Sequence, residues 1–336
     1  MSLTQGARNC SVIGMGKRAA VILMNMGGPD SLEAVSLFMH NLFMDESVFQ
    51  FPLRRITQPI FATVLTRLRA EKVRRQYAQI GGRSPIGPLT HAQAIALRAA
   101  LRRHGCHAAV AVAMRYTHPG TEEALMQLAA EAPAAPLIAL PLYPHYCRAT
   151  TGSSLAELKR RISKFDQSGK LQIIESYPTH PQYIAALVQR IAEKLRHSPP
   201  DTQILFSAHG VPQSYVREGD PYVSQIKATC KAVQLFFPAR TFHLAYQSKV
   251  GPVKWVGPSM EEMLHDLGGR GVKSLLVVPV SFVSDHIETL YEIDILYAGM
   301  AASAGIAQFE RVRSLNGSPL FIDCLASLVL EKLGQS

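Results

Sequence analysis

The sequence predicts an α/β fold in two similar halves, each built on a parallel sheet that is buried on both faces. Two observations predict this fold. Short apolar runs rich in β-branched residues alternate with longer helical patterns along all 336 residues. The turn after the first run, Gly27-Gly28-Pro29, is also echoed after the fifth run by Gly210-Val211-Pro212, as expected for a repeated half.

The first half is expected to alternate strands with helices. Four apolar runs are predicted to be its strands, at residues 19–26, 108–114, 137–142 and 171–176. The segments between them have helical patterns, and the one at 153–164 follows a polar loop rich in hydroxyl groups. A crossover helix lets consecutive strands pair in parallel, so we expect a parallel sheet.

The second half repeats this arrangement. Its predicted strands are at 203–208, 241–245, 274–283 and 309–312. Its predicted helices are at 182–197, 221–236, 259–267 and 319–333. A turn signal between Tyr177 and Pro181 marks the boundary between the halves. The expected organisation is a flexible N-terminus at 1–17, an N-terminal domain at 18–178, a C-terminal domain at 179–318 and a closing helix at 319–336.

The charge balance restricts the partners. Lys and Arg number 35 against 25 Asp and Glu, which leaves a net charge of +10. A basic surface attracts nucleic acid, an anionic membrane or an acidic small molecule, and charge alone leaves all three open. No apolar run approaches the roughly 20 residues that span a bilayer. The run at 19–24 is also too short for a signal peptide, so a cytoplasmic location is expected.

The cysteines are scattered and form no C-x-x-C pair. They are Cys10, Cys106, Cys147, Cys230 and Cys324. Without metal-site or redox spacing, we expect reduced and mostly buried thiols.

One basic segment departs from the α/β pattern. Residues 54–75 hold seven basic side chains against Glu71 alone, so they supply six of the ten net positive charges. Ile56, Ile60 and Val64 add apolar side chains at helical spacing. Such a basic amphipathic stretch is typical of helices that lie in an anionic membrane interface, although a solvated surface helix has the same composition.

Residues just after each predicted strand are candidate site residues, because open parallel sheets bind ligands beyond the carboxyl ends of their strands. His209 follows the strand at 203–208, and Gly210 leaves room for a ligand beside the backbone. A His at a strand end is structural about as often as functional. The polar loop at 143–154 leads into a helix whose N-terminus is suited to an anion.

A further group of polar residues follows the long apolar run at 274–283. In the string Ser284-Asp285-His286-Ile287-Glu288-Thr289-Leu290-Tyr291-Glu292, a helix would place Asp285, Glu288 and Glu292 on one face. Asp285 and Glu288 also have the spacing of a capping box, which leaves Glu292 unexplained. A Glu pair at i and i+4 costs roughly 0.2–0.5 kcal/mol, unless it holds protons or a cation. The pattern favours a proton or metal path.

Several common motifs are absent from the sequence. It has no P-loop, no G-x-G-x-x-G after the first strand and no G-x-S-x-G elbow, which argues against nucleotide binding and serine hydrolysis. The motifs it does have are Asn25-Met26-Gly27-Gly28-Pro29, Gly81-Gly82-Arg83-Ser84-Pro85, Met114-Arg115-Tyr116, Tyr143-Pro144-His145-Tyr146, Thr150-Thr151-Gly152-Ser153-Ser154, Ser207-Ala208-His209-Gly210, Gln247-Ser248-Lys249-Val250-Gly251, the 284–292 string and Ser314-Leu315-Asn316-Gly317. In order and spacing, over residues 19–330, they resemble the ferrochelatases.

The resemblance implies two Rossmann-like domains, each a four-stranded parallel sheet flanked by helices, with an active-site cleft between them. It implies a lyase that inserts ferrous iron into protoporphyrin IX to form protohaem, the last step of haem biosynthesis. His209 and Glu288 match the family's pair at the metal-insertion centre, where His209 is a base for pyrrole protons or a ligand for iron. Asp285, His286 and Glu292 are expected to continue the acidic path.

The resemblance also implies contacts with the porphyrin. The matching residues are Met26, Tyr77, Ser84, Arg115, Tyr116 and Tyr246. Met26 stands where members that act on coproporphyrin commonly carry Tyr, which favours protoporphyrin. Tyr246 stands where many relatives have Trp and is expected to keep an aromatic wall. Residues 50–75 match the family's active-site lip, which is apolar and associates with the membrane.

Some family members carry an iron–sulfur cluster, which needs four thiolates. Here Cys147 lies one place early and no Cys follows Cys324. We therefore expect no cluster. We also expect no permanently bound cofactor, and iron is expected to be a substrate. The expected partners include the inner face of the membrane, through peripheral contact, and exclude nucleic acid. A chelatase for coproporphyrin or another tetrapyrrole, and a non-catalytic porphyrin- or haem-binding protein, are the alternatives.

Overall fold

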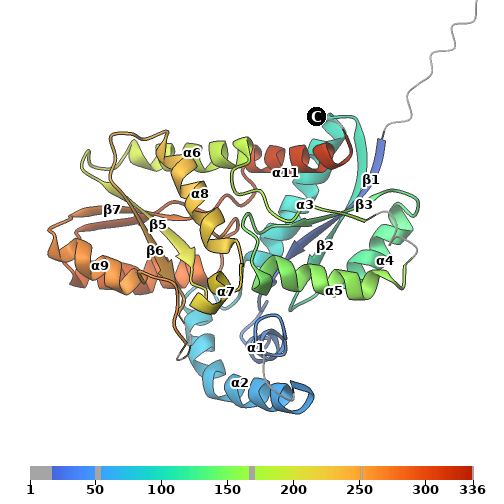
Figure 1. Cartoon of the computed structure of the whole chain (residues 1–336), viewed down its shortest axis with the longest axis horizontal. Coiled ribbons are helices and arrows are strands. Elements are labelled where there is room, and N and C mark those ends of the chain that lie inside the picture. The colour runs from blue at the N-terminus through green and yellow to red at the C-terminus, as the bar shows by residue number, and fades with distance from the viewer. Residues whose placement is uncertain (1–16, 50–53, 166–170, 250, 252, 335–336) are drawn as a thin grey trace, which may run out of the picture.

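The computed structural model describes residues 17–334 apart from 50–53, 166–170, 250 and 252. Within this range the chain forms two four-stranded sheets, and all their strand pairs are parallel. The strand order is β2-β1-β3-β4 in one sheet and β6-β5-β7-β8 in the other, which is the same order four strands later. Figure 1 shows the two sheets flanked by helices. The predicted fold class and its two similar halves are confirmed.

The strands follow the apolar runs. The first sheet has β1 (Lys17–Asn25), β2 (Cys106–Met114), β3 (Leu137–Pro141) and β4 (Leu171–Ile173). The second has β5 (Gln203–His209), β6 (Phe242–Gln247), β7 (Ser274–Pro279) and β8 (Gln308–Arg311). The prediction of a strand over 274–283 is wrong in its last four residues. Pro279 has no N–H to donate to the ladder, and the chain leaves the sheet after it.

Both faces of the first sheet are buried. Along β1, Val21 and Leu23 belong to one hydrophobic cluster, whereas Ile22 and Met24 belong to another. Successive side chains of a strand point to opposite faces, so an unbroken apolar run requires cover on both sides.

Helices other than α1 and α2 provide this cover. The helices of the first half are α1 (Val35–Phe43), α2 (Arg54–Ala78), α3 (Ile86–Arg103), α4 (Thr121–Glu131), the π-helix η1 (Arg148–Gly152) and α5 (Ser153–Ile162). In the second they are α6 (Pro181–Leu195), α7 (Gln213–Arg217), α8 (Tyr222–Gln234), α9 (Met260–Gly269), the π-helix η3 (Glu288–Tyr297), α10 (Ala298–Ser303) and α11 (Pro319–Lys332). Among the described helices, none is both long enough and apolar enough to cross a membrane.

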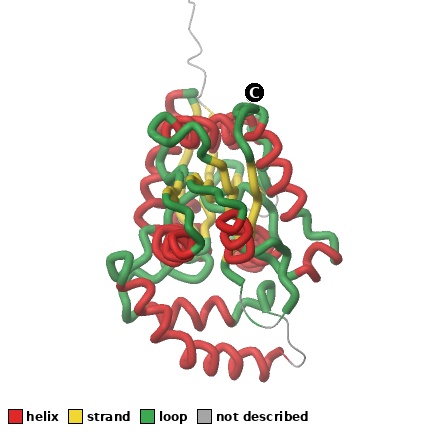
Figure 2. Tube along the Cα trace, turned by 90° about the vertical axis from the view of Figure 1, so that its left-hand side faces the viewer, coloured by secondary structure: helices red, strands yellow, loops and turns green. Residues whose placement is uncertain are grey.

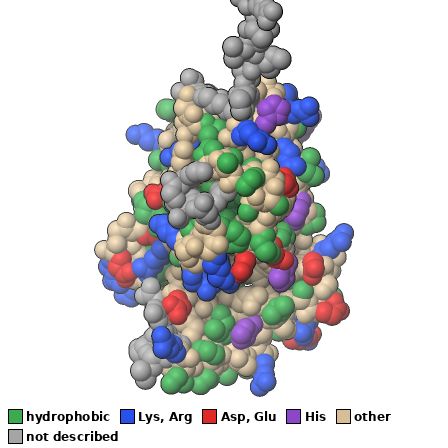
Figure 3. Space-filling view, turned by 90° about the vertical axis from the view of Figure 1, so that its right-hand side faces the viewer, with side chains coloured by type: hydrophobic (Ala, Val, Ile, Leu, Met, Phe, Trp, Pro, Cys, Tyr) green, Lys and Arg blue, Asp and Glu red, His purple; other side chains and the backbone are tan. Residues whose placement is uncertain are grey.

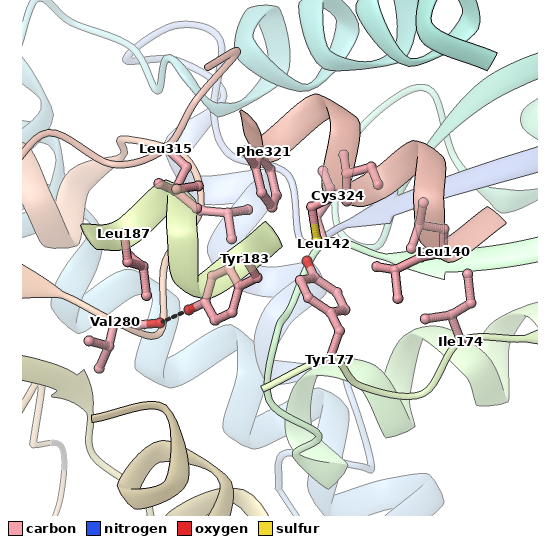
Figure 4. Close-up of a cluster of buried hydrophobic side chains, with 14 of the residues drawn as sticks. Leu140, Leu142, Ile174, Tyr177, Tyr183, Leu187, Val280, Leu315, Phe321 and Cys324 are labelled. Atoms are coloured by element: carbon pink, nitrogen blue, oxygen red, sulfur yellow. Dashed lines mark hydrogen bonds between the residues drawn. The ribbon is translucent and has the colours of Figure 1, made fainter. Parts of the chain in front are cut away.

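The two halves share one core. Val21 of β1 and Phe206 of β5 belong to the same hydrophobic cluster, and α11 packs against both α3 and α6. Figure 4 shows part of this cluster, in which the hydroxyl of Tyr183 donates to the carbonyl oxygen of Val280 over 3.0 Å. The side chains of α6 thereby connect the core to the chain that leaves β7.

Helices α1 and α2 form a separate layer beneath the sheets (Figures 1 and 2). Phe38 and Phe43 of α1 pack with Ala62, Ala70 and Tyr77 of α2 in one apolar cluster. From Arg54 on, the predicted lip is therefore a helix with one buried face. Residues 50–53 of the lip lie outside the described residues. The flexible N-terminus expected at 1–17 lies outside them up to residue 16, and the domain boundary after residue 178 stays a prediction.

Candidate functional site

The candidate site lies at the carboxyl ends of β5 and β6. His209 and Gln247, the last residues of these strands, are neighbours in the parallel register. The N–H of Gly210 donates to the carbonyl oxygen of Gln247 over 2.8 Å. A Cβ at Gly210 would lie 2.9 Å from that oxygen and 3.1 Å from the ring of Trp255, so only glycine fits here without a shift. The groups that approach Gly210 closely in the structure are thus the backbone of Gln247 and the ring of Trp255.

His209 and Glu288 are joined by a hydrogen bond, with 2.9 Å between Nδ1 and Oε2. The backbone of His209 is fixed as well, because its N–H donates to Ser281 and its carbonyl oxygen accepts from Tyr222. Burial lowers the pKa of His209, but the charge and hydrogen bond of Glu288 outweigh burial, so the pKa is raised. Nε2 makes no hydrogen bond to the described residues, and the side chain is 36% exposed. This nitrogen is free to meet a substrate.

His286 lies on the other side of Glu288, with 3.5 Å between its Nε2 and Oε2 of Glu288. Its Nδ1 lies 3.1 Å from the carbonyl oxygen of Ser284, and because a carbonyl only accepts, Nδ1 carries a proton. Burial raises the pKa of Glu288, yet the charges and hydrogen bonds of His209 and His286 bring it well below its usual range. Glu288 is therefore a carboxylate between two imidazoles.

Glu292 is the second acid of the group. Its Oε2 accepts from Nε2 of Gln247 over 3.0 Å and from the hydroxyl of Ser248 over 2.5 Å. The same Nε2 of Gln247 donates to the main-chain carbonyl of Glu288 over 2.9 Å. Burial and the charge of Glu288 raise the pKa of Glu292 to about 7. A carboxyl group that titrates near neutrality is suited to take up and release protons.

The helix that holds these acids differs from the prediction. It is a π-helix and begins at Glu288, so Asp285 precedes it and does not share its face. The predicted capping box is wrong, because the N-terminus of η3 has no side-chain cap. The oxygens of Asp285 are occupied by other donors. π-Helical winding is rare and concentrates at functional sites, and no residue pattern in the sequence signals it.

Asp285 belongs to a neighbouring network. Its Oδ1 accepts from Nη1 of Arg311 over 2.7 Å and from the hydroxyl of Thr289 over 3.2 Å, and its Oδ2 accepts from Nδ2 of Asn316 over 2.8 Å. Burial raises the pKa of Asp285, but the charge of Arg311 and the hydrogen bonds outweigh burial, so the pKa is lowered. The structure thus brings His209, His286, Glu288 and Glu292 together and places Asp285 beside them.

Three predicted porphyrin contacts lie in one apolar cluster. Met26, Tyr77 and Tyr116 pack there with Ile287, which directly precedes Glu288. Burial and the nearby charge of Glu288 raise the pKa of Tyr77. The cluster therefore adjoins the acidic group, whereas the cleft expected between the halves stays a prediction.

Ser84 lies against the turn after β1. Its N–H donates to the carbonyl oxygen of Pro29 over 2.7 Å. A Cβ at Gly28 would lie 2.6 Å from the side chain of Ser84, which explains the glycine in this motif. Ser84 is buried and lies against Gly28, two residues after Met26.

Arg115 is held by a residue that the sequence analysis missed. Its Nη2 lies 3.0 Å from Oδ2 of Asp45, and its Nε donates to the hydroxyl of Ser153 over 2.8 Å. The hydroxyls of Tyr116 and Ser153 also donate to Asp45. A carboxylate of the chain thus meets the side chain of Ser153, and the anion site expected at the start of the helix over 153–164 stays a prediction. Asp45 was unpredictable because its partners are far away in sequence.

Tyr246, which is expected to keep an aromatic wall, packs into the core, and its contact with a porphyrin stays a prediction. Tyr246 is 3% exposed and belongs to the shared core, and burial raises its pKa to about 12. Trp255 instead has its ring against Gly210, next to His209. Trp255 is the only Trp of the sequence. Its position eight residues after Gln247 was the only feature of the sequence that could have indicated a place near the site.

No preformed metal cluster is present among the described residues, where no three or more His, Cys, Asp or Glu are arranged to hold an ion. Cys106, Cys147, Cys230 and Cys324 are buried, as expected, and none of these four is in a disulfide, whereas Cys10 lies outside the described residues. Burial raises the pKa of Cys147 and Cys324 to about 12.

Comparison with known proteins is consistent along the chain. The family model described as Ferrochelatase matches residues 18–333. A ferrochelatase of Geobacter metallireducens is 50% identical over 317 residues, covering 94% of this chain and 98% of the relative. A ferrochelatase of Synechocystis is 45% identical over 322 residues, covering 94% of this chain and 83% of the relative.

Solved structures of lower similarity share the fold. The sirohydrochlorin chelatase SirB from Bacillus subtilis subspecies spizizenii, in complex with cobalt, has a TM-score of 0.53 at 10% identity and covers 94% of each chain. CbiX, described as the terminal enzyme for siroheme biosynthesis in denitrifying bacteria, has a TM-score of 0.51 at 13% identity, covering 94% of this chain and 99% of its own. Identities this low support the architecture alone.

Proposed function

This chain belongs to the ferrochelatase family and is a lyase that inserts iron into a porphyrin in haem synthesis, and from that premise we propose that His209 and Glu288 form its metal-insertion centre. We further propose protoporphyrin IX as the porphyrin. The observation that carries the proposal is the contact of Glu288 with Nδ1 of His209, which leaves Nε2 free beside a second acid, Glu292, whose pKa is about 7.

Iron insertion releases the pyrrole protons of the free-base ring, so the site must accept protons as the metal enters. A carboxylate at Nδ1 fixes the tautomer of His209 and increases the basicity of Nε2. In the proposed mechanism, Nε2 of His209 takes a pyrrole proton or contacts the incoming ferrous ion, since imidazole suits both roles. Glu292, held by Gln247 and Ser248, then accepts the proton that leaves the first pair.

The proposed porphyrin wall is the apolar cluster of Met26, Tyr77 and Tyr116, in which Met26 is half-buried and the two buried tyrosine rings support it. A flat macrocycle hides its nitrogen lone pairs, and binding energy from such a wall promotes metallation if it favours a bent ring. Met26 supports protoporphyrin over coproporphyrin because an apolar thioether suits vinyl groups. Arg115 contacts Asp45 through Nη2 and Ser153 through Nε, and we propose that its Nη1 donates to a propionate.

Peripheral membrane contact through α2 is part of the proposal. Its outer face exposes Ile56, Ile60, Val64 and Leu68 at intervals of four residues, with exposed fractions of 51–75%. Figure 3 shows apolar and basic side chains together along the lower edge of the molecule, where α2 lies in Figure 1. Exposed apolar side chains with flanking cations suit an anionic bilayer surface. We accordingly propose a cytoplasmic protein at the inner face of the membrane.

The remaining expectations stay proposals. Iron is a substrate, and we propose that the protein carries no iron–sulfur cluster, which the early position of Cys147 supports. We also propose no nucleic-acid partner, because six of the ten net positive charges lie in residues 54–75, beside the porphyrin wall.

The decisive experiment mixes the protein anaerobically with ferrous iron and either protoporphyrin IX or coproporphyrin, and follows the metalloporphyrin absorption spectrum. The proposal expects faster metallation of protoporphyrin. Faster turnover of coproporphyrin would favour the alternative chelatase. Tight porphyrin binding without metallation would favour a binding protein.

A further inference from the structure

Arg311, the last residue of β8, joins two carboxylates near the acidic group. Its Nη1 lies 2.7 Å from Oδ1 of Asp285. Its Nε and Nη2 lie 2.8 Å from Oδ1 and Oδ2 of Asp294, respectively. This paired contact uses the planar fork of a guanidinium, which Lys cannot reproduce. The Arg311 side chain is 7% exposed and that of Asp285 is 13% exposed, so this ion pair is shielded from water, whereas Asp294 is 37% exposed.

The two carboxylates flank the proposed active acids along the chain. Asp285 lies three residues before Glu288, and Asp294 lies two residues after Glu292. Asp285 is also fixed to Asn316 through two hydrogen bonds, of 2.8 and 2.9 Å. Both active acids therefore lie on the stretch of chain between two points that a single side chain holds.

The helix between these points requires support. η3 extends over ten residues, whereas π-helical winding usually occurs as a single-turn bulge. Glu288 and Glu292 add like charges on the same helix, which opposes their close approach. On the β6 side, Gln247 binds the main chain of Glu288 and the carboxylate of Glu292. On the β8 side, the corresponding support comes from Arg311.

We propose that Arg311 is a positioning residue for metal insertion, which fixes the winding of η3 through Asp285 and Asp294 and thereby places Glu288 and Glu292 beside His209. Asp285 acts within this link and does not carry protons. The inference rests on the proposed function, because it takes Glu288 and Glu292 as the active acids.

The kinetic test compares Arg311→Gln and Arg311→Lys with the matched control Arg313→Gln. We expect Arg311→Gln to lower kcat for iron insertion about 10- to 100-fold, the cost of displacing active groups by about 1 Å. KM for the porphyrin should stay within about twofold, because Met26, Tyr77 and Tyr116 lie on elements other than η3. Arg311→Lys should be intermediate. Arg313 is exposed and two residues away, so its variant removes the same charge and should keep the wild-type kcat.

Further measurements separate positioning from general loss of structure. Amide hydrogen exchange over 288–297 should accelerate in Arg311→Gln, whereas exchange in β5 should not change. Asp294→Asn, at a side chain that is 37% exposed, should lower kcat in the same direction and combine non-additively with Arg311→Gln. These effects together would identify one link from Arg311 to η3.

Three outcomes would overturn the inference. One is a kcat in Arg311→Gln equal to that of Arg313→Gln. Another is a loss of activity that matches the unfolded fraction. The third is an Asp285→Asn variant that loses activity while Arg311→Gln does not, since Asp285 would then carry protons itself. Failure of the wild-type protein to metallate a porphyrin would instead refute the proposed function.

Discussion

The carboxylate of Glu288 contacts Nδ1 of His209 at 2.9 Å, and it thereby connects the first residue of η3 to the last residue of β5. The pair aligns the free Nε2 edge of His209 and sets its basicity. Four of the predicted acid and base residues meet here. The pair is accessible from one side, since His209 is 36% exposed whereas Glu288 is 16% exposed.

Replacing Glu288 tests the pair directly. In Glu288→Gln the charge that raises the pKa of His209 is lost while the side-chain shape is kept, so the pKa should fall. We expect kcat to drop at least about 100-fold, the usual effect of losing acid–base catalysis. Anaerobic metallation kinetics and an NMR titration of His209 measure the two effects. Glu261→Gln, at an exposed acid on α9, is the control. Unchanged turnover in Glu288→Gln would remove Glu288 from the site.

The raised pKa of Glu292 predicts a pH-dependent stability. Its pKa is about 7 in the folded protein against 4.5 for an ordinary Glu, so the folded state binds the proton more tightly. The resulting stabilisation is complete below about pH 4.5 and is lost as the pH rises through 7. Glu292→Gln stays neutral, so above pH 7 its free energy of unfolding should exceed that of the wild type by about 1–3 kcal/mol. Denaturant titrations at pH 5 and pH 8 measure this. An equal difference at both pH values would contradict the assignment.

Asp45 should matter for both stability and porphyrin binding. It is a buried carboxylate that holds Arg115, and Asp45→Asn leaves that guanidinium without its counter-charge. We expect a loss of about 3 kcal/mol in the free energy of unfolding and a higher KM for the porphyrin. Chemical denaturation and steady-state kinetics provide the measurements. Asp30→Asn, at an exposed acid, is the control and should change neither value. A KM as low as that of the control would separate Asp45 from substrate binding.

Membrane contact through α2 predicts loss of vesicle binding in Ile60→Ser/Leu68→Ser. Each of these exposed side chains contributes about 1.5–3 kcal/mol when buried, so the double variant should bind anionic vesicles at least about tenfold more weakly. Co-sedimentation measures the binding. Leu235→Ser is the matched control, because Leu235 and Leu68 are both 75% exposed and Leu235 follows α8. Equal binding of both variants would show that α2 does not contact the bilayer.

Gly210→Ala tests the close approach beside His209. The new Cβ would lie 2.9 Å from a backbone oxygen, which cannot move aside as a flexible side chain does. We expect a loss of about 1–3 kcal/mol in the free energy of unfolding, with a lower kcat because His209 shifts. Gly87→Ala in α3 meets no atom within 4 Å and is the control, with an expected gain of up to about 1 kcal/mol. Thermal unfolding measures the stability of both variants. Equal stabilities would show that the close contact at Gly210 does not constrain the chain.

Much of the fold was predictable because its signals are local. Apolar runs produced strands, and the end of β5 and the residues after β7 carried the polar groups that meet at the site. His209, Glu288 and Glu292 were found in this way. The roles of the predicted site residues stay predictions.

The rest of the site depended on long-range contacts that no local pattern reveals. Asp45 meets Tyr116 across 71 residues and Ser153 across 108 residues. The π-helical winding of η3 was equally hidden, because its residues suit an α-helix. Asp285 was predicted on the face of the acids, yet Arg311 and Asn316, more than 25 residues later, determine its surroundings.

The position of α11 affects the order in which the protein can be assembled during synthesis. This helix packs against α3, so the core that buries Leu97 and Leu101 is completed by residues 319–332. A ribosome makes the first sheet long before these residues emerge. The apolar face of α3 that α11 covers is therefore left without this cover until residues 319–332 have left the ribosome.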